Sequence, residues 1–174
     1  MTAPFHLKLR GLQEPLAGPV WAAQARALWP AYEKWWMRDG ERSRATFLAC
    51  RRALRAHMPE LEPTWARLVE LLGGSDIQAR FMSMWCPPPY ITGCSQAIWP
   101  GSPNDAPCLL RNYDFAPALF EGTWLSSAWH GRRVLAMSDC LWGCLDGLNE
   151  SGLAASLSFG GRTVVGAGFG VPIV

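Results

Sequence analysis

The feature that most constrains the fold is a change in hydrophobic periodicity near Pro87-Pro88-Pro89. Before this run, apolar residues recur at spacings of three, four and seven, which is typical of amphipathic helices. After it, apolar residues alternate or form short runs between Gly, Pro, Asn and Asp, which is typical of strands and turns. The change predicts an α+β protein, with a helical first half followed by an antiparallel sheet.

Four helices are predicted in the first half. Asp39-Gly40 ends the first helix, Gly73-Gly74 ends the third, and Ser75 is an N-cap for the fourth. The predicted helices run from about residue 15 to residue 38, from about 42 to 61, over 64–72 and over 76–84. Six strands are predicted in the second half, over 94–99, 108–113, 123–130, 132–138, 142–145 and 152–159. The third and fourth strands are expected to form a hairpin that turns at Gly131.

Composition excludes several classes of protein. With 49% hydrophobic and 17% charged residues the chain can bury enough apolar surface to fold. A net charge of +2 does not indicate the strongly basic surface that nucleic-acid binding requires. The longest uncharged stretch, 81–104, contains five prolines, which a membrane-spanning helix does not tolerate. The start of the chain shows no secretory signal, and six cysteines are too sparse for a disulfide scaffold. We expect a cytoplasmic protein with reduced thiols and no nucleic-acid or membrane partner.

The first candidate for chemistry is Gly93-Cys94, at the junction between the two halves. A cysteine after a flexible glycine can attack the glycine carbonyl, accept the acyl group on sulfur and, after hydrolysis, become a new N-terminal residue. Its free α-amine, with a pKa of about 7.7 to 8.0, can then accept the thiol proton. The alternative is that Cys94 is a small buried apolar residue.

The second candidate is Arg111-Asn112-Tyr113-Asp114, at the end of the next predicted strand. Two antiparallel strands bring Arg111 and Asp114 back beside Cys94, where a guanidinium favours a thiolate and a carboxylate can hold an ammonium group. The alternative is an ion pair or turn at the surface. A third segment, 146–154, is rich in Asp, Asn and Gly, and turn formation alone explains it.

These three segments, in this order, resemble the cysteine type of N-terminal nucleophile (Ntn) hydrolases. The resemblance is to the group that contains acyl-coenzyme A:6-aminopenicillanic acid acyltransferase and, more distantly, choloylglycine hydrolase and acid ceramidase. It covers nearly all of the chain after Tyr90, whereas the helical half matches only in character and position. It implies a helical propeptide over 1–93 and, over 94–174, the start of an αββα catalytic domain with antiparallel sheets.

The resemblance also implies roles for individual residues. Cleavage between Gly93 and Cys94 would give two subunits that stay associated, with Cys94 as the nucleophile of both processing and catalysis. Arg111 would lie against the thiol and the substrate carbonyl, and Asp114 would hold the α-amine. The supporting residues are Asn112 and Asn149, and we expect Asn149 to shape the entry to a strand rather than to touch substrate. No cofactor or metal is implied.

One position departs from the bile salt hydrolases, which place an oxyanion-binding asparagine ten residues beyond the motif asparagine. The same count lands here on Phe159, which cannot donate a hydrogen bond. A backbone N–H of residues 158–161, or a group beyond Val174, would have to replace it. The departure favours the acyltransferase-like branch. The apolar run 163–174 also leads us to expect that these residues are the front part of a longer protein.

The leading hypothesis is a self-processing cysteine amidohydrolase or acyltransferase that acts on a linear amide through a thioester on Cys94. The expected partners are a small amide or acyl substrate and the cleaved N-terminal segment, and a second copy of the chain is left open. The alternatives are a non-catalytic binding protein of the same fold and an inactive truncated fragment. Five tryptophans are further candidates to line an acyl pocket near Cys94: Trp85, Trp99, Trp124, Trp129 and Trp142.

Overall fold

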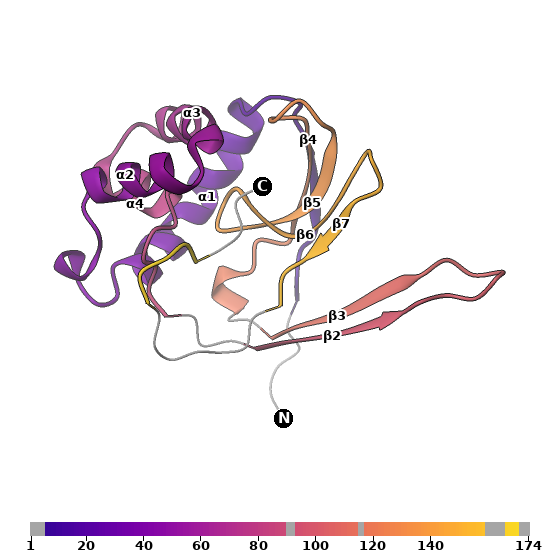
Figure 1. Cartoon of the computed structure of the whole chain (residues 1–174). Coiled ribbons are helices and arrows are strands. Elements are labelled where there is room, and N and C mark those ends of the chain that lie inside the picture. The colour runs from indigo at the N-terminus through magenta and orange to yellow at the C-terminus, as the bar shows by residue number, and fades with distance from the viewer. Residues whose placement is uncertain (1–5, 90–92, 115–116, 159–165, 171–174) are drawn as a thin grey trace.

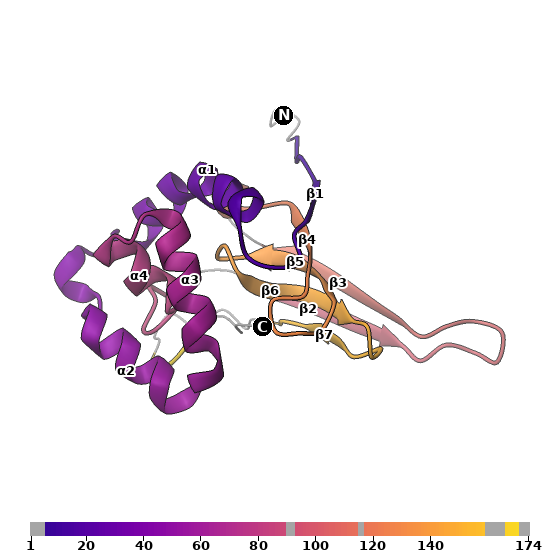
Figure 2. The same cartoon turned by 90° about the horizontal axis from the view of Figure 1, so that it is seen from above.

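The helices and strands form separate layers of one fold. The computed structural model describes residues 6–89, 93–114, 117–158 and 166–170. The helices gather on one side of the molecule, a five-stranded sheet lies beside them, and a hairpin formed by residues 93–114 extends away from both (Figures 1 and 2). The helices are α1 (Pro19–Trp36), α2 (Phe47–His57), α3 (Glu62–Leu72) and α4 (Asp76–Met82), with short 3-10 helices at Glu41–Ser43, Pro59–Leu61 and Pro117–Leu119. The strands are β1 (Arg10–Gln13), β2 (Gly93–Trp99), β3 (Cys108–Asp114), β4 (Thr123–Ser127), β5 (Val134–Asp139), β6 (Gly143–Asn149) and β7 (Ala154–Ser156). The α+β class is therefore confirmed.

The ends of the helices follow from local sequence. The Ser75 hydroxyl accepts a hydrogen bond from the backbone N–H of Gln78, as an N-cap does, and Gly73 ends α3 in the left-handed region at φ 113°. The second helix starts later than predicted. Thr46 caps α2 by accepting from the N–H of Ala49, so the residues around Arg42 form a 3-10 turn instead.

The N-terminus of α1 is capped by a side chain outside the helix. Gly18 occupies the N-cap position and offers no side chain, and the buried carboxylate of Glu14 accepts hydrogen bonds from the backbone N–H groups of Gly18, Val20 and Trp21 at 3.1, 2.9 and 2.8 Å. The negative charge also lies at the positive end of the helix dipole. Glu14 thereby provides an acceptor for three backbone N–H groups at the start of α1 that have no partner within the helix.

We expect Glu14→Ala to lower the free energy of unfolding by about 2–4 kcal/mol, because three backbone N–H groups lose a charged acceptor. Glu14→Gln keeps one acceptor oxygen and should cost clearly less. Urea unfolding of both variants beside the unaltered chain measures the difference. Equal stabilities for the Ala variant and the unaltered chain would show that water replaces the carboxylate.

The five-stranded sheet has the order β1-β4-β5-β6-β7. The predicted hairpin of β4 and β5 is confirmed, with Gly131 in the intervening turn at φ 77°. Strand β1 was not predicted and pairs parallel to β4, so the sheet is mixed rather than antiparallel throughout. Gly122 permits this approach, because a Cβ there would lie 2.3 Å from the carbonyl oxygen of Lys8. The first half of the chain thus contributes a strand as well as helices.

Strand β6 is longer than predicted. The expected strand ended at residue 145, with a turn from Asp146 onward, but β6 continues to Asn149 and the turn follows it. Strand β7 covers only Ala154–Ser156 of the predicted 152–159, and Phe159 lies outside the described residues. The extension of β6 places the Asp146 side chain on a sheet face rather than in a loop.

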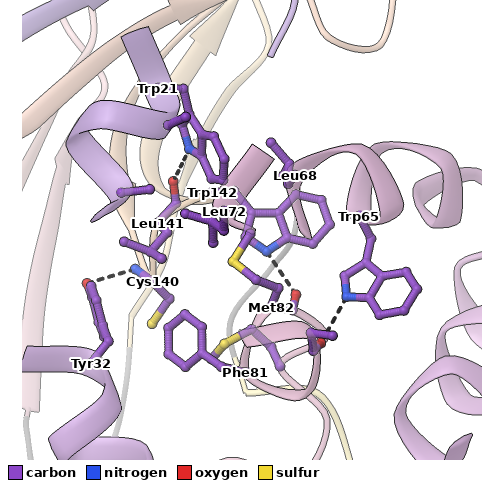
Figure 3. Packing of buried hydrophobic residues seen from close by; sticks show 14 of the residues in the cluster. Trp21, Tyr32, Trp65, Leu68, Leu72, Phe81, Met82, Cys140, Leu141 and Trp142 are labelled. Carbon is purple, nitrogen blue, oxygen red and sulfur yellow. Dashed lines mark hydrogen bonds between the residues drawn. The ribbon is translucent and has the colours of Figure 1, made fainter. Parts of the chain in front are cut away.

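The main core lies between the helices and the nearby end of the sheet (Figure 3). Three buried indoles donate to backbone carbonyls of other segments: Trp21 to Leu141 at 2.8 Å, Trp65 to Ala79 at 3.0 Å and Trp142 to Met82 at 2.9 Å. The first and third bonds join the helical part to the segment between β5 and β6. Because buried polar groups are costly without partners, these bonds fix how the helices sit against the sheet.

Candidate active site

The β2–β3 hairpin brings two of the predicted site residues together. In its register Cys94 lies opposite Tyr113, and Gln96 lies opposite Arg111. Because strand side chains alternate between faces, Cys94, Gln96, Arg111 and Tyr113 share one face of the hairpin. The Arg111 guanidinium reaches diagonally along this face, and its Nη2 lies 3.4 Å from the Cys94 sulfur. A half-buried thiol therefore has a cation within hydrogen-bonding distance.

Arg111 is held from several directions. Its Nε donates to the carbonyl oxygen of Leu157 at 3.0 Å, and its Nη1 forms an ion pair with Asp146 at 3.2 Å. The guanidinium carbon lies 4.6 Å from the centre of the Tyr113 ring. Only 7% of the Arg111 side chain is exposed, so these contacts replace water as its partners. The guanidinium beside Cys94 is thus fixed in place by the five-stranded sheet and by its own hairpin.

Asp146 is a site residue that the sequence pattern did not indicate. Its carboxylate pairs with Arg111 and also accepts a hydrogen bond from the hydroxyl of Ser156 on β7. The sequence did contain one indication, an acidic residue directly after the apolar residues of a predicted strand. A carboxylate on a sheet face is expected to have a hydrogen-bonding or cationic partner there. The turn-like composition of residues 146–149 hid that indication.

The structure does not bring Asp114 to the sulfur. Asp114 lies opposite Gly93, next to the Gly93–Cys94 peptide bond, but on the other face of the hairpin from Arg111. Its carboxylate accepts a hydrogen bond from the Asn112 amide at 2.9 Å. Asp114 therefore lies across the hairpin from Gly93 rather than beside the thiol of Cys94.

Asn149 shapes the turn between β6 and β7. Its side-chain oxygen accepts hydrogen bonds from the backbone N–H groups of Ser151 and Leu153, both at 3.0 Å. This is the Asx type of turn that lets an asparagine organise the backbone after it. The contacts agree with the expectation that Asn149 forms the entry to a strand.

A pocket of about 310 Å³ borders the Arg111 side of the hairpin. It is lined by Leu7, Arg111, Tyr113, Pro117, Phe120, Met137 and Asp146. None of the five tryptophans predicted for an acyl pocket is in this lining. Trp129 and Trp142 instead line a pocket of about 460 Å³ that includes Leu61 and Ala136. Ala136 and its neighbour Met137 point to opposite faces of β5, so the larger pocket lies on the face turned away from Arg111.

Two carboxylates are buried together beneath this site. Glu121 accepts hydrogen bonds from the hydroxyls of Tyr32 and Ser138, each at 2.6 Å, and from the N–H of Leu141 at 2.6 Å. Asp139 accepts from the hydroxyl of Tyr113 at 3.4 Å, and its other oxygen lies 3.3 Å from the Tyr32 hydroxyl oxygen. Burial, reinforced by the charge of Glu121, raises the pKa of Asp139 to about 7, and burial also raises the pKa of Glu121. The pair thus retains a proton near neutral pH.

Other kinds of site find no support in the part of the chain that the structure describes. No three His, Cys, Asp or Glu side chains within it are grouped as metal ligands. No helix there has both the length and the apolar character needed to cross a bilayer. Of residues 158–161, which were predicted to supply an oxyanion donor, 159–161 lie outside the described ranges. Leu157, just before them, contacts Arg111 through its carbonyl.

Comparison with known families agrees with the resemblance drawn from the motifs. Residues 101–174 match the family of acyl-coenzyme A:6-aminopenicillanic acid acyl-transferase. The match confirms the predicted resemblance to this Ntn-hydrolase-related family for that part of the chain, and it supports an enzyme of the acyltransferase or hydrolase kind. It includes Arg111, Asp114 and Asn149, and it begins after Cys94. No curated protein and no solved structure gave a significant match.

Proposed function

We propose that the protein is a self-processing cysteine amidohydrolase or acyltransferase whose nucleophile is Cys94. The observation that carries the proposal is the 3.4 Å contact between the Arg111 guanidinium and the Cys94 sulfur, at the end of a strand that starts with Gly93. A guanidinium at this distance stabilises a thiolate, and the thiolate is the form of cysteine that attacks a carbonyl. The family match after residue 101 supports acyl transfer as the reaction type.

Processing would begin within the chain. The Cys94 sulfur attacks the Gly93 carbonyl carbon, a carbon–sulfur bond forms, the peptide carbon–nitrogen bond breaks, and the thiol proton ends on the released amine. Water then hydrolyses the thioester, which leaves a carboxylate on Gly93 and restores the thiol of Cys94. The new α-amine would be held as an ammonium group by Asp114, a role supported by the position of Asp114 opposite Gly93 in the register.

The same sulfur would then act on substrate. The α-amine accepts the thiol proton, and the sulfur attacks the amide carbonyl to form a tetrahedral intermediate whose oxyanion needs N–H donors. The amine leaves with a proton and an acyl thioester remains on Cys94. Water or a second amine resolves the thioester, which gives hydrolysis or acyl transfer respectively.

The remaining elements of the proposal concern substrate and partners. The pocket of about 310 Å³ beside Arg111 suits a small apolar acyl group, since its lining is largely carbon. The other partner is residues 1–93 themselves, which share the core with the sheet and would remain bound after cleavage. All six cysteines are free, which suits the reducing cytoplasm in which we place the protein.

The test is the intact mass of the purified protein from the longest available reading frame, beside its Cys94→Ala variant. We expect two fragments divided between Gly93 and Cys94 in the unaltered protein and a single uncut mass in the variant. Cys108→Ala is the matched control, because Cys108 is an exposed thiol at the far end of the same hairpin, and it should be cut normally. A single uncut mass for all three proteins would contradict self-processing and favour a non-catalytic binding protein.

A further inference from the structure

Tyr113 connects Arg111 to the buried carboxylates. One side of the connection is the guanidinium carbon of Arg111, 4.6 Å from the Tyr113 ring centre. The other is the Tyr113 hydroxyl, which donates to Asp139 Oδ2 at 3.4 Å. The phenol stays protonated at ordinary pH, because burial and the charge of Asp139 raise its pKa. Tyr113 is therefore a fixed donor that joins the hairpin to the end of β5.

Asp139 is in turn held by the helical part of the chain. Its Oδ1 accepts from the backbone N–H of Cys140 at 3.0 Å and lies 3.3 Å from the hydroxyl oxygen of Tyr32, in α1. The Tyr32 hydroxyl itself accepts from the N–H of Cys140 and donates to Glu121. Neither Glu121 nor Asp139 forms an ion pair with any described residue. The contacts run without a break from Tyr32 through Asp139 and Tyr113 to Arg111 and the Cys94 sulfur.

We propose that Tyr113, anchored by Asp139, is a positioning residue that holds the Arg111 guanidinium against Cys94, and that Tyr32 anchors the same network from the helical part. The inference rests on the proposed function for its purpose, since a fixed guanidinium matters only where the sulfur reacts. It also means that residues 1–93 remain a working component of the site, because Tyr32 lies before the cleavage point. The other contacts of Arg111, to Asp146 and Leu157, fix its edge, whereas Tyr113 supports its face.

The test measures the reactivity of the Cys94 thiol directly. The full chain is alkylated with iodoacetamide between pH 6 and 9, and the rates at Cys94 and Cys108 are read separately from peptide masses. Cys108 is exposed at the far end of the same hairpin, so the ratio of the two rates is controlled within each molecule. This ratio is independent of turnover. Because cleavage gives Cys94 a free α-amine, the Cys94 peptides of cut and uncut chains, which differ in mass, are scored separately and only uncut chains are compared.

We expect Tyr113→Phe to lower the Cys94 to Cys108 ratio at pH 7.5 by about threefold to tenfold, the worth of one net hydrogen bond. Tyr113→Leu should lower it further, because the ring under the guanidinium is lost as well. Asp139→Asn keeps an acceptor for Tyr113 and should retain more of the ratio than Asp139→Ala. Tyr32→Phe should lower the ratio in the same direction as Tyr113→Phe, and thermal unfolding of each variant checks that the fold persists.

Three outcomes would overturn the inference. The first is a ratio in Tyr113→Phe equal to that of the unaltered chain. The second is a fall in Tyr113→Leu alone, which would make the ring sufficient and the bond to Asp139 irrelevant. The third is a Cys94 that reacts no faster than Cys108 in the unaltered chain. Failure of the proposed function is separate, because it is read from the intact mass of Cys94→Ala and not from alkylation.

Discussion

Removal of the Arg111 guanidinium should nearly abolish cleavage between Gly93 and Cys94. We expect Arg111→Met to slow the appearance of the two fragments by about 100-fold or more, the usual effect of removing one preorganised donor to a developing negative charge. Arg111→Lys keeps a positive charge, but one ammonium group cannot contact Cys94, Asp146 and Leu157 together as the planar guanidinium does. The cleavage rate of Arg111→Lys should therefore lie between the rates of Arg111→Met and of the unaltered chain. All three rates are followed by intact mass over time.

Two controls separate chemistry from folding in this experiment. Arg133→Met removes an arginine of which 82% of the side chain is exposed, paired with Glu150 on the surface, and should leave the rate unchanged. Arg111→Met leaves the partly buried Asp146 without its cation, which destabilises the fold independently of the reaction. Adding Asp146→Asn should recover stability but not cleavage. If the double variant cleaves at the normal rate, the guanidinium acts only through the fold.

The sequence predicted the parts of the site that depend on local pattern. Two predicted strands joined by one loop form a hairpin, and this local arrangement alone predicted that Arg111 on the second strand lies beside Cys94 on the first. The four helices and the turn at Gly131 were also predictable, because hydrophobic period and punctuation by Gly, Pro and Ser carry that information. The same local reasoning placed Asp114 near Cys94, where the alternation of strand side chains puts it on the other face.

The contacts between distant segments could not be predicted. Strand β1 is four residues long with a glycine in it, and its pairing with β4 depends on Gly122, over a hundred residues later. Asp146 was predicted to lie in a turn because residues 146–149 are rich in Asp, Asn and Gly, which are typical of turns. Only the pairing of β6 with β5 places Asp146 on a strand. Tyr32 and Glu121 meet because the core packs α1 against the sheet. Such contacts follow from tertiary packing, which overrides local propensity.

The buried acid pair makes stability depend on pH in an unusual direction. The pKa of Asp139 rises from its ordinary 3.8 to about 7 in the folded protein, because of burial first and the charge of Glu121 second. Between these values the folded state binds more protons than the unfolded state, so the free energy of unfolding falls as pH rises from about 4 to about 7 and then levels off. Each additional proton bound by the folded state contributes about 1.4 kcal/mol per pH unit. Glu121 shifts in the same direction.

We therefore expect the urea midpoint of the unaltered chain to be higher at pH 5 than at pH 8. The part of this difference that comes from Asp139 should disappear in Asp139→Asn, in which no proton is lost at position 139, whereas the part that comes from the buried Glu121 should remain. The carboxyls of Glu62 and Glu150, whose pKa values are lowered by neighbouring arginines, act in the opposite direction only at lower pH, as they become protonated. Asp105→Asn, at the exposed tip of the β2–β3 hairpin, is the matched control and should keep the difference. A midpoint that rises from pH 5 to pH 8 would mean that both buried carboxylates are ionised in the fold, with Tyr32, Tyr113 and Ser138 as sufficient donors to both.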